Sequence, residues 1–112
     1  MKVSFEGIGE TVAGFYNDGA ALGKVCKISG SGTVSACAVG ERFFGIVTKC
    51  CDGFASVAVG GFVTVAYSGA APEVGFVKLC ADGEGGVKAA AGGAEFAVVS
   101  VDEGAGILTI II

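Results

Sequence analysis

The acidic side chains that stand close together are the first candidates for catalytic chemistry in this sequence. Paired carboxylates can act as general acid and base, and proton transfer near neutral pH otherwise most often uses histidine. The chain contains no histidine. Its close carboxylate pairs are Glu6 with Glu10, Asp82 with Glu84, and Asp102 with Glu103. All of them fall in glycine-rich turns or near the amino terminus, where solvation and turn hydrogen bonds account for them. The sequence therefore predicts no catalytic dyad.

The cysteines are the second candidates, as nucleophiles, metal ligands or disulfide partners. The five of them are Cys26, Cys37, Cys50, Cys51 and Cys80. No C-x-x-C motif and no histidine are present to build a zinc site or to activate a thiolate. The odd count and the lack of a recognisable signal peptide disfavour a disulfide framework. We expect the cysteines to pack as small apolar residues, with Cys50 and Cys51 pointing to opposite faces of a strand.

Two glycine-rich stretches share only fragments of known ligand-binding loops. Residues 30–33 and 83–86 lack the Gly-Lys-Ser/Thr ending of a phosphate-binding loop, and neither precedes an expected helix. The sequence Asp82-Gly-Glu84 lacks the spaced acidic ligands and the final glutamate of an EF-hand loop. We therefore expect hairpin turns at both places, and no cofactor or metal.

The composition of the chain further restricts the classes of function that it could have. The chain has 112 residues, of which 53% are hydrophobic and 16% are charged, with a net charge of −4. A typical soluble domain has about 25% charged residues. Part of the surface is therefore expected to be covered by copies of the chain or by a partner, although a bland exterior rich in glycine and alanine is the alternative. The basic residues are scattered and the apolar runs are short, so neither nucleic-acid binding nor membrane insertion is expected.

Short β-rich segments separated by glycine-containing turns fill the sequence. We predict strands near residues 12–16, 24–29, 33–38, 43–50, 55–59, 61–68, 76–81, 86–90, 95–101 and 107–112. Many short strands at regular spacing, with no long amphipathic helix, are typical of a small sandwich or barrel. The sequence thus predicts an all-β, single-domain β-barrel or sandwich of short strands with glycine-rich turns.

The stretch from Phe43 to Tyr67 shows this alternation of β-rich segments and glycine-containing turns most clearly. Asp52-Gly53 predicts a tight hairpin turn. From Val57 onward the odd positions are apolar, and this alternation continues through Gly60-Gly61. A hairpin and a bent continuous ribbon are equally consistent with the glycine pair. In either case we expect the odd-numbered face to lie in the core.

The two ends of the sequence differ in character. Residues 1–17 are expected to form an amino-terminal arm or a loosely packed first strand, and residues 18–112 a β-barrel-like domain. The segment Ile107–Ile112 is strongly β-forming, so we expect it to pair within the fold or in a subunit contact. With no apolar signal sequence at the start, we expect the chain to remain in the cytoplasm of the cell that makes it.

The order of these pieces resembles a known family of phage proteins. The matching segments include Gly23-Lys-Val-Cys-Lys-Ile-Ser, Thr33-Val-Ser-Ala-Cys-Ala-Val-Gly-Glu-Arg-Phe-Phe-Gly-Ile-Val, Val57-Ala-Val-Gly-Gly-Phe-Val-Thr-Val, Gly75-Phe-Val-Lys-Leu-Cys-Ala-Asp-Gly and Ala97-Val-Val-Ser-Val-Asp with Ile107-Leu-Thr-Ile. Over roughly residues 20–112 the chain resembles the small glycine-rich capsid decoration (cement) proteins of tailed bacteriophages and prophages, formerly classed as a domain of unknown function.

This resemblance implies a function without catalytic residues. It implies a homotrimer on the outer capsid surface that stabilises the head, located in the virion and in the bacterial host cytoplasm during assembly. An amino-terminal arm would contact the major capsid protein. The candidate contact residues, chosen by position alone, are Lys2, Val3, Phe5, Glu6, Ile8 and Glu10.

Two other classes of function remain open at this point. One is a small β-sandwich recognition module for carbohydrate or protein, although the absence of tryptophan and the presence of only two tyrosines disfavour a carbohydrate binder. The other is a different phage structural protein, such as a tail or fibre component. An enzyme is the least favoured class, since no group of residues supplies its chemistry.

Overall fold

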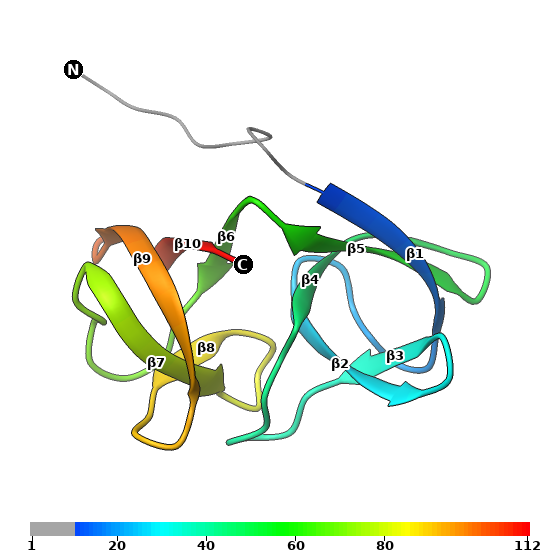
Figure 1. The fold of residues 1–112 in the computed structure, drawn as a ribbon, viewed down its shortest axis with the longest axis horizontal. Helices are drawn as coiled ribbons and strands as arrows, with labels where there is room; N and C mark the ends of the chain where they lie inside the picture. Colours follow the sequence, from blue (N-terminus) through cyan, green and yellow to red (C-terminus); the bar gives the residue numbers. More distant parts are fainter. Residues whose placement is uncertain (1–10) are drawn as a thin grey trace.

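The computed structural model describes residues 11–112, and these residues form ten β-strands in two sheets (Figure 1). The strands are β1 (Thr11–Asn17), β2 (Val25–Gly30), β3 (Thr33–Ala36), β4 (Gly45–Cys51), β5 (Phe54–Gly60), β6 (Phe62–Ala66), β7 (Gly75–Ala81), β8 (Val87–Ala89), β9 (Ala94–Asp102) and β10 (Ile107–Ile111). Every strand overlaps one of the predicted segments. The expectation of an all-β fold made of short strands is confirmed.

The first five strands form a closed barrel in the order β1-β3-β2-β4-β5, with β1 also paired to β5. All neighbours are antiparallel except β1 and β3, which run parallel. The β4–β5 hairpin turns at Asp52-Gly53, where both residues have positive φ (41° and 83°). This geometry is the one that the Asp-Gly pair predicts, because it matches the twist of the flanking strands.

The last five strands form a second sheet in the order β6-β10-β9-β7-β8. All pairings between these strands along the sheet are antiparallel. An isolated parallel bridge between Tyr67 and Val87 then joins the end of β6 to β8, so that the two edge strands of the sheet meet. As expected for the strongly β-forming carboxyl-terminal segment, β10 pairs within the fold, with β6 on one side and β9 on the other.

The two sheets repeat the same topology. Strands β6 to β10 make among themselves the pairings that β1 to β5 make, including the parallel contact between the first and third strands. Two local details recur as well. The backbone N–H of Asp18 donates to the carbonyl of Val34 at 2.8 Å, and that of Ser68 donates to the carbonyl of Val87 at 2.9 Å. Both acceptor valines are fully buried.

A bulge also recurs in the fourth strand of each unit. The β4–β5 register shifts after Val47, and the β9–β10 register shifts after Val98. These valines are both buried, and they lie about fifty residues apart, at the upper end of the spacing of internal repeats. The chain is therefore built as two five-stranded units of like topology.

The glycine pair at 60–61 marks the passage from one unit to the other. Strand β5 ends at Gly60 and β6 begins at Phe62, yet these two strands do not pair with each other. The arrangement is a bent continuous chain rather than a hairpin. The expected burial of the odd-numbered face is confirmed, since Val57, Val63 and Val65 are all buried in the core.

Buried apolar side chains form two clusters. The smaller one fills the closed barrel and includes Ala20, Cys26, Val34, Val47, Ala55 and Val57. The larger one contains the inward-facing residues of the second sheet, among them Val63, Leu79, Val98, Leu108 and Ile110, together with Val25, Cys37, Phe43, Ile46 and Ala58 from the first unit. The rings of Phe43 and Phe96 stack across the two units with centroids 4.8 Å apart. The larger cluster therefore joins the units into one fold.

Gly45 gives a direct test of how tightly β4 and β5 approach each other. A Cβ at this position would lie 2.5 Å from Cγ1 of Val57 and 2.6 Å from the carbonyl oxygen of Ala58. We expect Gly45→Ala to lower the free energy of unfolding by about 2 kcal/mol or more, the cost of an overpacked core. The measurement is chemical denaturation followed by circular dichroism.

The matched control is Gly14→Ala in β1, another strand glycine. An added Cβ there meets nothing within 4 Å. Its unfolding free energy should stay the same or rise by a few tenths of a kcal/mol, through a less flexible unfolded chain. Equal destabilisation by both substitutions would contradict the close β4–β5 contact.

Candidate interaction surfaces

Asp82 and Asp102, one residue from each of two candidate carboxylate pairs, serve as turn caps, whereas Glu6 and Glu10 lie outside the described residues. Oδ1 of Asp82 accepts hydrogen bonds from the backbone N–H groups of Glu84 at 2.7 Å and Gly86 at 3.0 Å, and Oδ2 accepts one from the hydroxyl of Ser68 at 2.5 Å. Oδ1 of Asp102 accepts one from the N–H of Ala105 at 3.1 Å. These carboxylates hold the β7–β8 and β9–β10 loops in shape, as the turn interpretation predicted.

The pKa of Asp82 reflects this role. Partial burial acts to raise the pKa, but the hydrogen bonds from Ser68, Glu84 and Gly86 outweigh it and lower the pKa below its ordinary value. Each of these bonds favours the ionised carboxylate. Asp82 is therefore a charged acceptor that ties the β7–β8 loop to Ser68, two residues after the end of β6.

The cysteines divide into a buried set and an exposed pair. Cys26, Cys37 and Cys80 are buried and free, as expected. Burial raises the pKa of Cys26 to about 12 and that of Cys37 to about 11, so both remain protonated thiols at neutral pH. Cys50 and Cys51 are exposed, which corrects the expectation that all five would pack in the core. They lie in the outer half of β4, beyond the part of the strand that the second sheet covers.

The adjacent thiols of β4 lie on different sides of the strand, as predicted. Sγ of Cys50 lies 3.8 Å from both the side-chain nitrogen of Asn17 and the carbonyl oxygen of Ala20. Cys51 instead lines a shallow hollow with Lys49 and Phe54. Within residues 11–112, no group of three or more histidine, cysteine, aspartate or glutamate side chains could hold a metal ion. In the same part of the chain, no helix has the length and apolar character needed to cross a membrane.

A groove with a volume of about 540 Å³ runs beside the start of β4. Its lining residues are Lys27, Ile28, Glu41, Arg42, Phe43, Phe44 and Ala94. Lys27 and Glu41 form an ion pair at 2.7 Å, and Glu41 also accepts a hydrogen bond from the N–H of Ala38 at 2.6 Å. These two contacts lower the pKa of Glu41. Glu41 thus holds the loop before β4 through these two contacts. The groove itself is an apolar surface with charged residues at its border.

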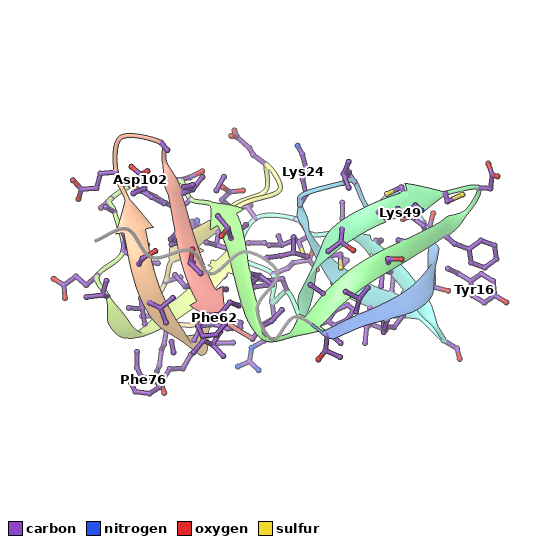
Figure 2. The ribbon with its side chains drawn as sticks, turned by 90° about the horizontal axis from the view of Figure 1, so that it is seen from above. Tyr16, Lys24, Lys49, Phe62, Phe76 and Asp102 are labelled. Carbon is purple, nitrogen blue, oxygen red and sulfur yellow. The ribbon has the colours of Figure 1, made fainter. Side chains whose placement is uncertain are left out.

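Exposed apolar side chains are the most prominent surface feature of the described chain, and both units present them. On the first unit, Tyr16 and Phe54 are 60% and 56% exposed, and their ring centroids lie 5.3 Å apart. On the second unit, Phe76 is 79% exposed and Val74 is 65% exposed. Tyr16 and Phe76 lie at opposite ends of the molecule (Figure 2). The alternation of apolar residues along each strand did not reveal these positions, because it does not say which face a second layer covers.

The nominated arm residues Lys2, Val3, Phe5, Glu6, Ile8 and Glu10 lie outside the described residues. The part of the expected arm that the structure does describe is β1, which pairs with β5 along its length and with β3 at its end. Thr11, the first described residue, pairs with Gly60. The described part of the chain therefore begins beside the passage between the two units.

In comparisons with known proteins, no family model matches this chain and no curated protein is significantly similar to it.

The Asp82 cap generates a prediction about stability and pH. The folded-state pKa of Asp82 is lowered. The contribution of its ionised carboxylate to folding stability is therefore present above the unfolded-state pKa, about 4, and is lost as the pH falls through the folded-state pKa. We expect Asp82→Asn to lower the unfolding free energy at pH 7 by about 1–2 kcal/mol, since the carboxylate is partly solvated. The gap between the wild type and the variant should narrow below about pH 4.

Urea denaturation at a series of pH values measures both effects. Glu84→Gln is the matched control, because it removes a charge from the same loop at an exposed position, and it should change stability by less than about 0.5 kcal/mol. If the difference in unfolding free energy between the wild type and Asp82→Asn does not vary with pH, Asp82 is not an ionised cap.

Proposed function

We propose that this chain is a structural protein: a capsid decoration protein of a bacteriophage or prophage. In this role it binds the outer surface of the head through the major capsid protein and stabilises the shell. It acts there as a homo-oligomer, a trimer by the family resemblance, and it performs no catalysis. Its location is the virion, after a period in the bacterial host cytoplasm during assembly.

The exposed apolar surface of a rigid β scaffold is the observation that carries this proposal. Large apolar side chains that are singly exposed are ordinary in soluble proteins. Here several large apolar side chains are exposed on both units, among them Tyr16 beside Phe54 on the first and Phe76 on the second. Together with a charged fraction of only 16%, this distribution supports a chain whose surface is covered in its working assembly.

The use of the polar residues supports the same proposal. Asp82, Asp102 and Glu41 are engaged in shaping loops, and the two thiols with raised pKa values are buried. These polar groups therefore serve the fold. A decoration protein needs little more than a stable scaffold with contact surfaces, because repetition over a shell lets individually weak contacts hold.

The proposed capsid contact can be tested by co-sedimentation with empty shells of the major capsid protein encoded in the same phage or prophage genome. We expect the wild type to pellet with the shells and to saturate at a fixed stoichiometry. The double variant Phe5→Ser/Ile8→Ser removes the apolar side chains of the nominated arm, and its affinity should fall by about tenfold or more. Its thermal unfolding should match that of the wild type.

Val39→Ser is the control, since Val39 is 61% exposed and lies in the β3–β4 loop outside the arm. This variant should pellet as the wild type does. Wild-type protein that stays in the supernatant at every ratio to shells would contradict the proposed function. Pelleting that the arm substitutions leave unchanged would reject the arm as the contact but keep the function.

A second candidate function rests on the Tyr16–Phe54 pair. Exposed aromatic rings form stacking platforms for sugar rings in many recognition modules, and these two rings lie side by side with an interplanar angle of 34°. A recognition module for carbohydrate would use this surface. If this candidate is correct, the wild type binds members of a glycan array, and Phe54→Ala abolishes that binding whereas Phe76→Ala does not. An array without hits would eliminate it.

A further inference from the structure

Four apolar residues form a continuous row across the outer face of the second sheet. Phe62 of β6 pairs with Ile111 of β10. Ile111 pairs in turn with Ala97 of β9, and Ala97 pairs with Phe76 of β7. Residues directly opposite each other in paired strands point to the same face of a sheet. We call this set the Phe76 row, and its two ends, Phe62 and Phe76, are labelled in Figure 2.

The Phe76 row has the composition of a contact surface. Phe76 is 79% exposed and Ile111 is 41% exposed, whereas Ala97 between them carries only a methyl group and is half-buried. Lys78 and Glu95, which pair across β7 and β9, border the row on the same face and are exposed. An apolar centre with a polar rim is the usual anatomy of a protein contact. The smallest side chain lies between the two most exposed ones, an arrangement that suits an incoming aromatic ring.

The described chain begins next to one end of this row. Thr11 pairs with Gly60, the last residue of β5. One residue further along, the carbonyl of Gly61 accepts a hydrogen bond from the N–H of Ile112 at 3.1 Å. Gly61 and Ile112 are the sequence neighbours of the two row residues in β6 and β10. The residues that precede Thr11 are therefore attached beside the β6–β10 end of the Phe76 row.

The sequence before Thr11 has the pattern of a segment with one buried face. We call residues 1–10 the leading segment. In it, Val3 and Phe5 alternate with the polar residues Lys2, Ser4 and Glu6. Alternation of apolar and polar residues is typical of an extended segment that covers an apolar surface on one side and meets solvent on the other.

The leading segment is also long enough to cross the row. Residues 3–10 span about 26 Å when extended. Four adjacent strands span about 14 Å, because neighbouring strands lie about 4.8 Å apart. Gly7 and Gly9 allow the backbone to bend from the β1 direction onto the sheet. The apolar side chains of the segment can therefore reach every member of the row.

We propose that the leading segment covers the Phe76 row of its own chain. Phe5 lies over Ala97, and the polar side chains of the segment face solvent. The other exposed aromatic surface, Tyr16 with Phe54, is a poorer fit because it lies at the end of the β1–β5 pairing opposite Thr11. Since the segment is tethered beside the row, it meets the row at a high effective concentration, and modest contacts are enough to hold it.

Solution NMR of the full chain tests this docking without capsid shells. In the wild type we expect nuclear Overhauser effects between the ring protons of Phe5 and the methyl protons of Ala97 and Ile111. Phe5→Ser should abolish these effects and shift the backbone amide signals of the Phe76 row. The amide signals of Tyr16 and Phe54 should stay in place, since those residues lie away from the row.

Ser4→Ala is the matched control, because Ser4 lies on the polar side of the alternation and next to Phe5. This variant should leave the signals of the row unchanged. A mixture of isotope-labelled and unlabelled chains separates contacts within a chain from contacts between chains. Three results would overturn the proposal: no such Overhauser effects in the wild type, equal shifts from both substitutions, or effects that arise only between chains. The last result would make the leading segment of another copy the occupant of the row.

A consequence for capsid binding rests on the proposed function, in which Phe5 and Ile8 contact the capsid. A docked leading segment must leave the row before these side chains can bind a shell. Phe76→Ser weakens the docking, so it should bind shells about threefold more tightly than the wild type does, because more chains have a released segment. Weaker shell binding by Phe76→Ser would assign the row to the capsid and overturn the docking. A wild type that binds no shells would contradict the proposed function but not the docking, which the NMR measurements decide.

Discussion

The fold depends on two neighbouring strands that are buried on both faces. In β4, Ile46 faces the large shared cluster and the next residue, Val47, faces the interior of the closed barrel. In β5, Ala58 and Val57 divide in the same way. Strands covered on both sides must be apolar at successive positions and cannot alternate with polar residues. This requirement explains why Ile46-Val47 and Val57-Ala58 are apolar at successive positions.

The local elements of the fold were predictable, because they depend on local signals. Asp52-Gly53 adopts the positive-φ turn that the dipeptide favours, and the strands between turns begin and end within a few residues of their predicted positions. The pairing of those strands was not predictable. Whether β5 pairs with β6 across Gly60-Gly61 or with β1, which lies more than forty residues earlier, depends on contacts that no short pattern encodes. The repeat of topology was missed for the same reason, although Val25-Cys-Lys-Ile and Phe76-Val-Lys-Leu gave a faint signal of it.

The candidate surface was predicted only in general terms. A low charged fraction indicated that some surface is covered in an assembly, and that inference did not point to any residue. Phe76 and Val77 are equally apolar in sequence, and only the placement of the second layer turns Val77 toward the core and leaves Phe76 in solvent. The exposed thiols of Cys50 and Cys51 have the same origin, since they lie in the part of β4 that extends past the second sheet. Which face of a strand is covered is therefore a property of the assembled layers, and it cannot be read from the strand.

The single residue between β5 and β6 has a consequence for how the contact between the two units responds to dilution. Because Gly61 alone separates the strands, each unit meets the other at an effective concentration set by the length of the connection. The contact that Val25, Ile46 and Ala58 make with the second sheet therefore stays formed however dilute the protein becomes. A contact between separate copies of a protein follows mass action instead. The joint between the two units is thus independent of the level of expression.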